Sequence, residues 1–470
     1  MTGLAIGSSF LISFGLGFGA FIAVFGITLL VRLRGAVGPV RTAAIVLASL
    51  TGAIWAQSSS PTPTTGLTTA GFEGVVRVAE GPFLTASGQR FVGYGRSTRE
   101  ERVCIYAGPT PKLHRGDRIF LSGRLIAPVD LAEIGNAALR ARNCSAQLNA
   151  ETMVVVEPGH GLVSALSRVR TDMSAFLMQA APGDAGALLS GLVTGDDGGL
   201  SEGAHDAFLA SGTTHITAIS GANFSVLILL LGVMATGAMK RSLWFVGAAT
   251  SAIWLFAIMV GLQPSALRAA LLATAVLSGR WLGRAPDLLT LTVLLAAIQI
   301  LFRPHDFWTL GFQLSIAATV ALIVVFDGSE RFGARSAGAS LALSVVAAQL
   351  ATLPILAATI GTLNGIGLFA NLLIGPLASL VFPIALVGAS IGFAAPWIGE
   401  MVLLPAIWLS GLMVDIVELA DRYLPGAVQL GRPVSAAIAV LTVACWSTIF
   451  ALSGDLRRMG RHAVSLVRNW

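Results

Sequence analysis

The sequence carries little charge. Only 11% of its 470 residues are Asp, Glu, Lys or Arg, whereas 55% are apolar and the mean hydropathy is +0.79. Soluble domains carry about 25% charged residues, so this composition indicates a membrane protein. Lysine is nearly absent, because Lys112 and Lys240 are the two lysines in the chain and arginine supplies the other basic residues. This arginine excess is typical of a GC-rich genome and of positively charged cytoplasmic loops. The alternative explanation is that the arginines bind nucleic acid.

The common catalytic motifs are also missing. The sequence contains no His-Glu-x-x-His pair, no P-loop and no histidine-rich metal cluster, so we predict no cofactor, no bound metal and no coupling to ATP within this chain. Ser220, His215 and Asp196 could be imagined as a hydrolytic triad, but the Gly-x-Ser-x-Gly elbow is lacking. A membrane-bound hydrolase is therefore the least favoured function, and we predict that the chain is not an enzyme.

Cysteine is scarce, with three residues in all. Cys104 and Cys144 fall in the one long polar segment, whereas Cys445 lies in an apolar run. If the polar segment is outside the cell, Cys104 and Cys144 could form a disulfide. The long connection between them leaves the distance between the two sulfur atoms open.

Long apolar runs are abundant, and they predict the fold class. Residues 10–31 and 43–56 read as two N-terminal spans, and Arg32, Arg34 and Arg41 between them place that loop in the cytoplasm. About nine further spans follow within residues 213–453, and residues 454–470 form a basic cytoplasmic tail. The run 366–394 contains Pro376 and Pro383, which predict a broken or re-entrant helix.

The chain is therefore predicted to be a polytopic α-helical membrane protein with about 11 spans, located in the bacterial cytoplasmic membrane. A small extracytoplasmic β-barrel of the OB type is inserted after the second span. It occupies residues 71–158, after a linker at 57–70, because five short β-prone runs with turn residues between them occur there. Residues 159–212 read as amphipathic or re-entrant helices at the outer face.

Basic and aromatic residues in the barrel segment form a candidate DNA-binding face. Barrels of this type bind single strands by combining basic side chains with aromatic stacking. The alternative is a structural exterior domain with ordinary strand aromatics. The candidate residues are Arg77, Arg90, Phe91, Tyr94 and Arg102.

A polar stretch, residues 212–223, opens directly into an apolar span. Its candidate residues are His215, Ser220, Gly221 and Asn223. At helical spacing, Ser220 and Gly221 share a face with Thr217, and Asn223 lies beside it. A small polar face of this kind suits either close helix packing or a lined pathway.

Three further polar residues lie inside predicted spans. Arg268 lies four residues after Pro264, near the outer end of its predicted span. It could be a buried functional arginine, or its side chain could snorkel to the outer lipid headgroups. Gln313 and Asn371 are candidates for a hydrophilic path, although each alone is more typical of an interhelical hydrogen bond.

Several motifs occur in one order along residues 188–376. They comprise residues 191–195 followed by Asp196, the stretch Thr214-His215 through Ser220-Gly221-Ala222-Asn223, residues 264–269, Gly311-Phe312-Gln313-Leu314-Ser315, Ala351-Thr352-Leu353-Pro354, and Ala370-Asn371-Leu372-Leu373 followed by Pro376. This set resembles the ComEC-type competence proteins, which are inner-membrane channels for DNA uptake. The paired N-terminal spans and the OB-like domain resemble the N-terminal region of the same family.

The resemblance implies passage of one DNA strand across the cytoplasmic membrane, with DNA receptor and pilus proteins upstream and a helicase or recombination proteins downstream. His215, Ser220, Gly221, Asn223, Arg268, Gln313 and Asn371 would then contribute to the translocation path. The alternative function is transport of another solute. The chain could also form a homo-oligomer.

The chain departs from the fullest family members in two respects. They carry a C-terminal metallo-β-lactamase-like domain, for which this sequence shows no metal-ligand motif, so we predict no nuclease activity. Degradation of the second strand would then need a separate protein, or the chain is a reduced member of the family. In addition, Ala222 and Asn223 stand where Leu-His is common, a variation associated with high-GC Gram-positive members.

Overall fold

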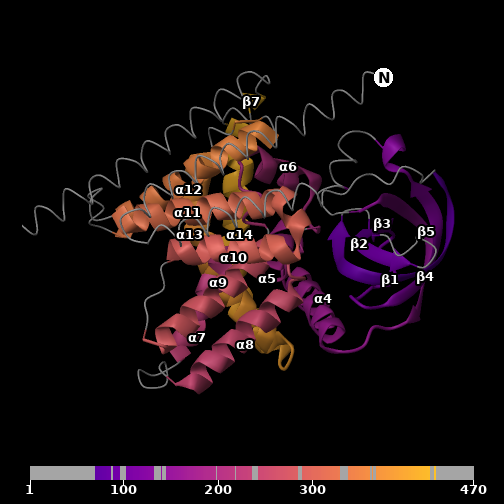
Figure 1. Ribbon diagram of the computed structural model, residues 1–470, viewed down its shortest axis with the longest axis horizontal. Coiled ribbons are helices and arrows are strands. Elements are labelled where there is room, and N and C mark those ends of the chain that lie inside the picture. The colour runs from indigo at the N-terminus through magenta and orange to yellow at the C-terminus, as the bar shows by residue number, and fades with distance from the viewer. Residues whose placement is uncertain are drawn as a thin grey trace, which may run out of the picture.

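The computed structural model describes the barrel and most of the helices that follow it (Figure 1). The described residues are 69–85, 88–95, 102–131, 139, 144–196, 198–217, 219–234, 242–283, 288–328, 337–359, 362–363, 367–423 and 428–429. The predicted spans 10–31, 43–56 and 434–452, nearly all of the linker 57–70 and the tail 454–470 lie outside them.

Five strands close into a barrel in the order β1-β2-β3-β5-β4. All neighbouring strands are antiparallel except β3 and β5, which are parallel. The predicted five-stranded barrel is confirmed, and its closure is consistent with the OB type. The strands are β1 (Ala70–Thr85), β2 (Gly88–Gly95), β3 (Arg102–Ala107), β4 (Arg118–Ile126) and β5 (Ala146–Glu157).

Alternation of side chains along the strands fills the barrel interior. Val76, Phe91, Ile105, Ile119 and Leu148 are all at most 1% exposed and pack against one another. Because successive side chains in a strand point to opposite faces, their polar neighbours point outward. The barrel therefore has an apolar core of its own.

A disulfide joins Cys104 of β3 to Cys144, as the sequence allowed. The two Cα atoms are 5.6 Å apart, a separation typical of disulfides. Val92, Leu139 and both cysteines form a small apolar cluster separate from the barrel core. Since Val92 pairs with Cys104 across β2 and β3, this cluster covers the middle of their outer face.

The disulfide supports a first prediction. Replacing both Cys104 and Cys144 by serine is expected to lower the free energy of unfolding of the barrel by about 4 kcal/mol, because the bond closes a loop over a sequence separation of 40. Urea unfolding of the detergent-solubilised chain measures the change. Reductant should destabilise the wild type equally and leave the double variant unaffected. An unchanged urea midpoint in the double variant would contradict the prediction.

The helices follow the barrel, with α4 lying between the barrel and the other helices (Figure 1). Helices form in the segment 159–212, predicted to be amphipathic or re-entrant, and in the segment predicted to contain the further spans. Their bounds are α4 (Leu162–Ala180), α5 (Asp184–Thr194), α6 (Glu202–Ala210), α7 (Gly221–Met234), α8 (Leu243–Met259), α9 (Pro264–Trp281), α10 (Leu288–Phe302), the 3-10 helix η4 (Pro304–Trp308), α11 (Leu310–Gly328), α12 (Ala337–Thr359), α13 (Gly367–Gly392) and α14 (Pro396–Tyr423). A two-stranded sheet joins β6 (Thr362–Leu363) to β7 (Val428–Gln429).

Local sequence explains several helix ends. Pro264 and Pro396 occupy the first turn of α9 and α14. Proline lacks a backbone N–H, and an N–H in the first turn would have no acceptor within the helix. Ser201 and Ser242 cap α6 and α8 by accepting a backbone hydrogen bond. Gly195 ends α5 with a positive φ of 72°, a conformation that glycine adopts without steric cost.

The described helices bury apolar side chains in two groups. The first group combines α4 to α9 with α13 and α14, and the second combines α10, η4, α11 and α12. We call the boundary between these groups the seam. It is the feature on which the candidate site is built.

Helix α13 corrects one prediction. Residues 367–392 form a single continuous helix although Pro376 and Pro383 lie inside it, so the predicted broken or re-entrant helix is wrong. Proline removes one backbone hydrogen bond, but packing of a buried face can maintain the helix. Buried Ile374, Val381 and Ala385 provide that face.

Two described helices have the length and apolar composition needed to cross a membrane. They are residues 369–392 of α13 and all of α14. Several other described helices are apolar but shorter, among them α7, α8 and α10.

Candidate functional site

The polar stretch 212–223 is not helical through most of its length. Its described residues from Thr213 to Ser220 form turns and irregular backbone, and α7 begins only at Gly221. The prediction that Thr217, Ser220 and Gly221 share one helical face is therefore wrong. Serine and threonine side chains compete with helical hydrogen bonds, and here Thr217 Oγ1 donates to the Thr214 carbonyl at 2.9 Å.

Asn223 fixes the start of α7 to the end of α5. Its side chain is buried, and its Nδ2 donates to the Leu192 carbonyl at 2.9 Å. Its Oδ1 accepts a hydrogen bond from Ser220 Oγ at 2.9 Å. The last carbonyls of a helix have no partner within the helix, so Asn223 satisfies one of them from outside.

Arg170 of α4 satisfies a second carbonyl at the same helix end. Its Nε donates to the Thr194 carbonyl at 2.9 Å, and the arginine is 4% exposed. A cation is favourable at a helix C-terminus, where the helix dipole is negative. The end of α5 is therefore held by α4 on one side and by α7 on the other.

Gly195 lies where three segments meet. A Cβ atom there would come within 3.0 Å of the Ile219 side chain and 3.4 Å of Gln263 Nε2. Ser265 Oγ of α9 also donates to the Ile219 carbonyl at 3.1 Å. The polar stretch is thus packed between the end of α5 and the start of α9.

The structure does not form the imagined triad of Ser220, His215 and Asp196. The Ser220 hydroxyl donates to Asn223, and His215 is exposed. Asp196 is buried at 8% exposure near the end of α5. A triad requires hydrogen bonds from nucleophile to base and from base to carboxylate, and these three residues do not supply them.

This arrangement leads to a prediction for Ser220. Replacing Ser220 by alanine removes one partly buried hydrogen bond, with a cost of about 1 kcal/mol, and does not remove a catalytic nucleophile. We expect the variant to retain protein level and biological activity within about fivefold of wild type. A complementation assay at matched protein level measures this, and complete loss of activity with normal protein level would restore the hydrolase interpretation.

Arg268 is buried on α9 and faces the second helix group. It is 3% exposed, and its guanidinium lies 5.1 Å from the centroid of the Phe312 ring. Neither Nη1 nor Nη2 has a hydrogen-bond partner within the part of the chain that the structure describes. A snorkelling arginine would expose its guanidinium, so that alternative is wrong. Unpartnered buried donors are costly, which marks Arg268 as a candidate binding residue.

A polar network lies next to Arg268 at the ends of α10 and η4. Gln299 Nε2 donates to Asp306 Oδ2 at 2.8 Å and to the Pro264 carbonyl at 3.2 Å. Arg303 Nη1 donates to the Leu262 carbonyl at 2.8 Å, and its Nε lies 3.5 Å from Asp306 Oδ2. These contacts hold the turn before α9, and thereby position Arg268 one turn later.

Gln313 faces η4 from α11. It is 1% exposed, and its Nε2 donates to the Phe307 carbonyl at 3.0 Å. Its Oε1 has no hydrogen-bond partner among the described residues. Arg268 and Gln313 therefore belong to one polar region, since Arg268 contacts the residue that precedes Gln313.

Asn371 lies at a second place along the seam. Its Nδ2 donates to Gln349 Oε1 at 3.0 Å and thereby joins α13 to α12. Helix α12 belongs to the second apolar group and α13 to the first. The contacts of Arg268, Gln299 and Arg303 also cross between the two groups. The seam is therefore lined by polar side chains at both places.

Four residues of this region were not predicted from the sequence: Arg170, Gln299, Arg303 and Asp306. The available signal was the charged run between two apolar spans, Arg303-Pro304-His305-Asp306, because a carboxylate and two basic groups at a span end need partners. Arg170 carried a weaker signal, since an amphipathic helix shows arginines on its polar face as a rule.

The barrel separates the five candidate DNA-binding residues. Tyr94 of β2 pairs with Arg77 of β1 and with Arg102 of β3, so these three form a row across the outer face. Phe91 is 1% exposed in the barrel core, so its predicted role in stacking on DNA is wrong. Arg90 lies 5.8 Å from the Phe83 ring, apart from the row.

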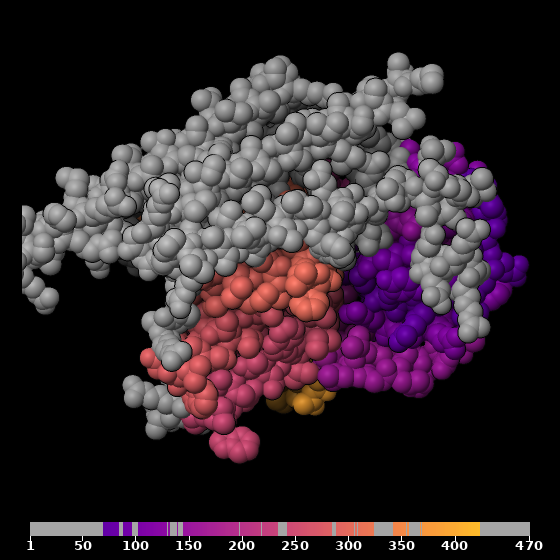
Figure 2. Space-filling model, viewed as in Figure 1, coloured from indigo at the N-terminus to yellow at the C-terminus, as the bar shows by residue number. Residues whose placement is uncertain are grey.

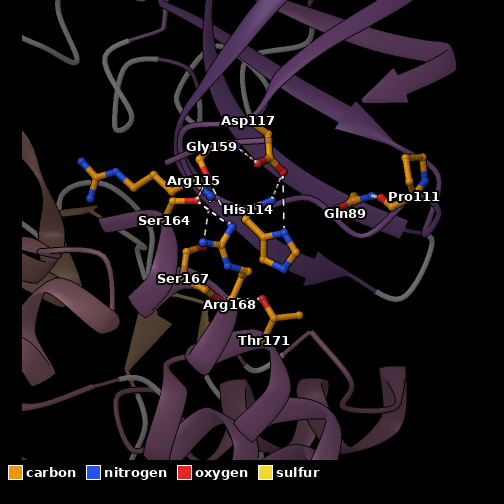
Figure 3. Close-up of polar contacts among 10 residues, drawn as sticks. All are labelled: Gln89, Pro111, His114, Arg115, Asp117, Gly159, Ser164, Ser167, Arg168 and Thr171. Atoms are coloured by element: carbon orange, nitrogen blue, oxygen red, sulfur yellow. Dashed lines mark hydrogen bonds and ion pairs between the residues drawn. The ribbon is translucent and has the colours of Figure 1, made fainter. Parts of the chain in front are cut away.

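The barrel contacts α4 through the turn between β3 and β4 (Figure 3). Arg115 N donates to Ser167 Oγ of α4 at 3.0 Å. Buried Asp117 accepts hydrogen bonds from His114 N and Gly159 N, at 2.6 and 2.7 Å. Figure 3 shows the Arg115 side chain pointing away from His114 and Asp117.

Arg170 makes the second contact between the barrel and the helices. Its Nη1 donates to the Pro82 carbonyl of β1 at 3.2 Å, and its guanidinium lies 4.5 Å from the centroid of the Phe83 ring. Pro82 and Phe83 lie where the pairing of β1 with β2 is irregular. One arginine therefore links the barrel, α4 and the end of α5.

Comparison with known proteins places most of the candidate site in one family. The family model described as competence protein matches residues 192–454, which is more than half of the chain. The chain belongs to the competence protein family. The match begins at Leu192, whose carbonyl accepts the hydrogen bond from Asn223, and it includes the whole seam. The barrel and α4 lie outside the match.

A curated relative agrees with this assignment. The chain is 25% identical over 267 residues to ComE operon protein 3 of Bacillus subtilis (strain 168). The alignment covers 53% of this chain and 33% of the relative, so the chain matches about a third of that protein's length. No solved structure gives a significant match.

Proposed function

We propose that this chain is a channel of the bacterial cytoplasmic membrane that passes a single strand of DNA during natural transformation. The polar seam carries the proposal. Two apolar helix groups meet there, and arginine, glutamine, asparagine and aspartate side chains line their boundary. Polar groups at membrane depth are tolerated where they are buried or line a cavity.

The chemistry of the seam suits a polyanion without sequence readout. Arg268 offers two buried guanidinium nitrogens without protein partners among the described residues, and Phe312 lies beneath it. Guanidinium groups bind phosphate through a planar set of donors. Amides from Gln313 and Asn371 supply neutral contacts, which allow a strand to leave as well as to enter.

The apolar helices and the disulfide support the proposed membrane placement. We propose a multi-pass protein with about 11 spans and with the barrel outside the cytoplasm. The Cys104–Cys144 bond supports the exterior placement, because disulfides persist in oxidising compartments. The chain itself cleaves no DNA in this proposal, so a separate nuclease removes the other strand.

The proposed partners follow the path of the strand. A DNA receptor and pilus proteins deliver DNA from outside, and a helicase or recombination proteins accept it in the cytoplasm. The row of Arg77, Tyr94 and Arg102 is the proposed DNA contact of the barrel, because it combines basic and aromatic side chains on one face.

Deletion of the gene in the native host tests the function. We expect transformation frequency to fall to background and to recover when the wild-type chain is supplied at normal level. Growth on minimal medium with different nutrient sources is measured in the same strains. Normal transformation combined with failure to take up a small solute would replace the DNA channel with a solute transporter.

A further inference from the structure

We propose that Arg268 and two nearby glutamines, Gln299 and Gln313, form a binding site for a small monovalent inorganic anion of the chloride type. The anion occupies the seam in the absence of DNA, and a phosphate group of the strand takes its place during passage. The exchange rests on the proposed channel function, whereas the anion site rests on the contacts and burial of these three side chains.

The Arg268 guanidinium supplies the donors of the site. The arginine is 3% exposed, and the Phe312 ring centroid lies 5.1 Å from its guanidinium. A ring stacked on the face of a guanidinium leaves the N–H groups at the edge of the plane to other partners. Nη1 and Nη2 have no hydrogen-bond partner among the described residues. These two nitrogens form the fork with which arginine binds anions.

The charges around this fork do not balance. Asp306 supplies the carboxylate of the neighbouring network, and Arg303 Nε lies 3.5 Å from its Oδ2. Arg268 forms no ion pair with a carboxylate within the part of the chain that the structure describes. Two guanidinium groups and one carboxylate give these three residues one net positive charge. A buried charge needs a partner of opposite sign, and one monovalent anion supplies it.

The two glutamines contribute acceptor oxygens of fixed orientation. Gln299 Nε2 donates to the Pro264 carbonyl and to Asp306 Oδ2, and Gln313 Nε2 donates to the Phe307 carbonyl. A carbonyl or a carboxylate oxygen accepts hydrogen bonds, so the amide nitrogens must face these groups. Each Oε1 is then without a partner among the described residues. Because an acceptor repels an anion at direct contact, we assign these oxygens to water molecules that hydrate the ion.

The three side chains come from neighbouring helices. Figure 1 shows α9, α10 and α11 side by side, and each of the three contacts the other two. Gln299 and Gln313 are 2% and 1% exposed, so they are as enclosed as Arg268. In Figure 2 the pink and orange helices of this part form a packed surface on the viewed face. Such an enclosed site admits a small ion, and a strand phosphate reaches it after the two helix groups separate.

Chloride NMR in detergent solution of the full chain is the first test. Chloride that exchanges with a protein site gives a broadened signal, and the wild type is expected to produce this broadening. Arg268→Met should lose most of it, because the fork that binds the ion is gone. Arg280→Met on the same helix is the matched control and should keep it, since Arg280 is exposed.

Thermal unfolding provides a second measurement on the same proteins. At one fixed ionic strength, replacement of sodium gluconate by sodium chloride should raise the Tm of the wild type by about 2 °C, because a ligand that binds the folded state stabilises it. In gluconate, Arg268→Met should be at least as stable as the wild type. Chloride should leave its Tm unchanged and so narrow the difference between the two proteins.

Two results would overturn the anion site. Equal broadening of the chloride signal by wild type and Arg268→Met would show that chloride binds elsewhere on the chain. Stabilisation of the wild type by inorganic phosphate, without any effect of chloride on Tm or line width, would assign the fork to phosphate groups and reject a resident chloride-type ion.

The exchange with DNA is measured by the binding of a fluorescein-labelled oligothymidylate at constant sodium concentration. Replacement of chloride by gluconate should tighten binding to the wild type about fivefold, the factor expected when a competing ion is present at about four times its dissociation constant. Constant sodium keeps the release of counterions from the strand unchanged. Arg280→Met should respond like the wild type, and Arg268→Met should not respond. An equal response of Arg268→Met would overturn the exchange.

The outcomes separate this inference from the channel itself. If deletion abolishes transformation but chloride binding does not depend on Arg268, the anion site is rejected and the channel is retained. If the deletion strain transforms normally, the channel and the exchange are rejected, whereas chloride binding at Arg268 would still support the anion site.

Discussion

Replacement of Arg268 by methionine is expected to reduce transformation roughly 10- to 100-fold while the protein remains as stable as wild type or becomes more stable. A hydrogen bond to a charged group contributes about 1.5 to 3 kcal/mol, which corresponds to that range. Methionine keeps the apolar length of the side chain and removes buried donors that lack partners among the described residues. Replacing buried charges by apolar residues of similar volume is often neutral or stabilising.

The opposite signs of these two effects make the prediction specific. If the only role of Arg268 were to stabilise the fold, Arg268→Met would lower stability and protein level together. Arg280→Met on the same helix is the control, because Arg280 is exposed near the end of α9. Transformation frequency and thermal unfolding in detergent are measured in parallel. A destabilised Arg268→Met protein with normal transformation per molecule would contradict the binding role.

Replacement of Arg170 by alanine is expected to release the barrel from the helices, with a loss of about 3–5 kcal/mol in the free energy that holds them together. The variant loses two contacts between α4 and the barrel, the charged hydrogen bond to Pro82 and the contact with the Phe83 ring. It also loses the hydrogen bond to Thr194, which joins α4 to α5. Charged hydrogen bonds and desolvated cation–π contacts each contribute about 1.5 to 3 kcal/mol. Their removal also leaves the end of α5 without its cation.

Limited proteolysis of residues 158–161, which connect β5 to α4, measures this release. Faster cleavage is expected in Arg170→Ala, and Arg170→Lys should restore only part of the protection, because lysine lacks the planar donor geometry. Asp172→Ala is the matched control, because Asp172 is an exposed residue of α4 two positions after Arg170. Equal cleavage of Asp172→Ala and Arg170→Ala would contradict the role given to Arg170.

The barrel could be predicted from the sequence because its strands alternate locally. The same alternation should have excluded Phe91 from the binding face, since it lies between Arg90 and Val92 and must point to the face opposite to Arg90 and Tyr94. The long β1 was harder to predict. Gly81 and Pro82 are typical of a turn, yet they form an irregularity within one strand.

The helices were predictable from their apolar runs, whereas the contacts between them were not. Asn371 pairs with Gln349 across 22 residues, and Gln299 reaches Pro264 across 35. Such pairs depend on the tertiary arrangement, which apolar periodicity does not encode. Pro376 and Pro383 predicted a break in α13 because local propensity favours one, but packing of the buried face overrides it.

The central claim is that one DNA strand passes through the seam. Its most direct measurement follows the entry of DNA that carries a radioactive label on one strand into cells that express wild type, Arg268→Met or Arg280→Met at equal level. The account predicts nuclease-resistant, single-stranded label in the wild-type and Arg280→Met cells. In the Arg268→Met cells it predicts that internal label falls roughly 10- to 100-fold and that most of the label remains outside and sensitive to nuclease. Equal internal label in all three strains would contradict the account.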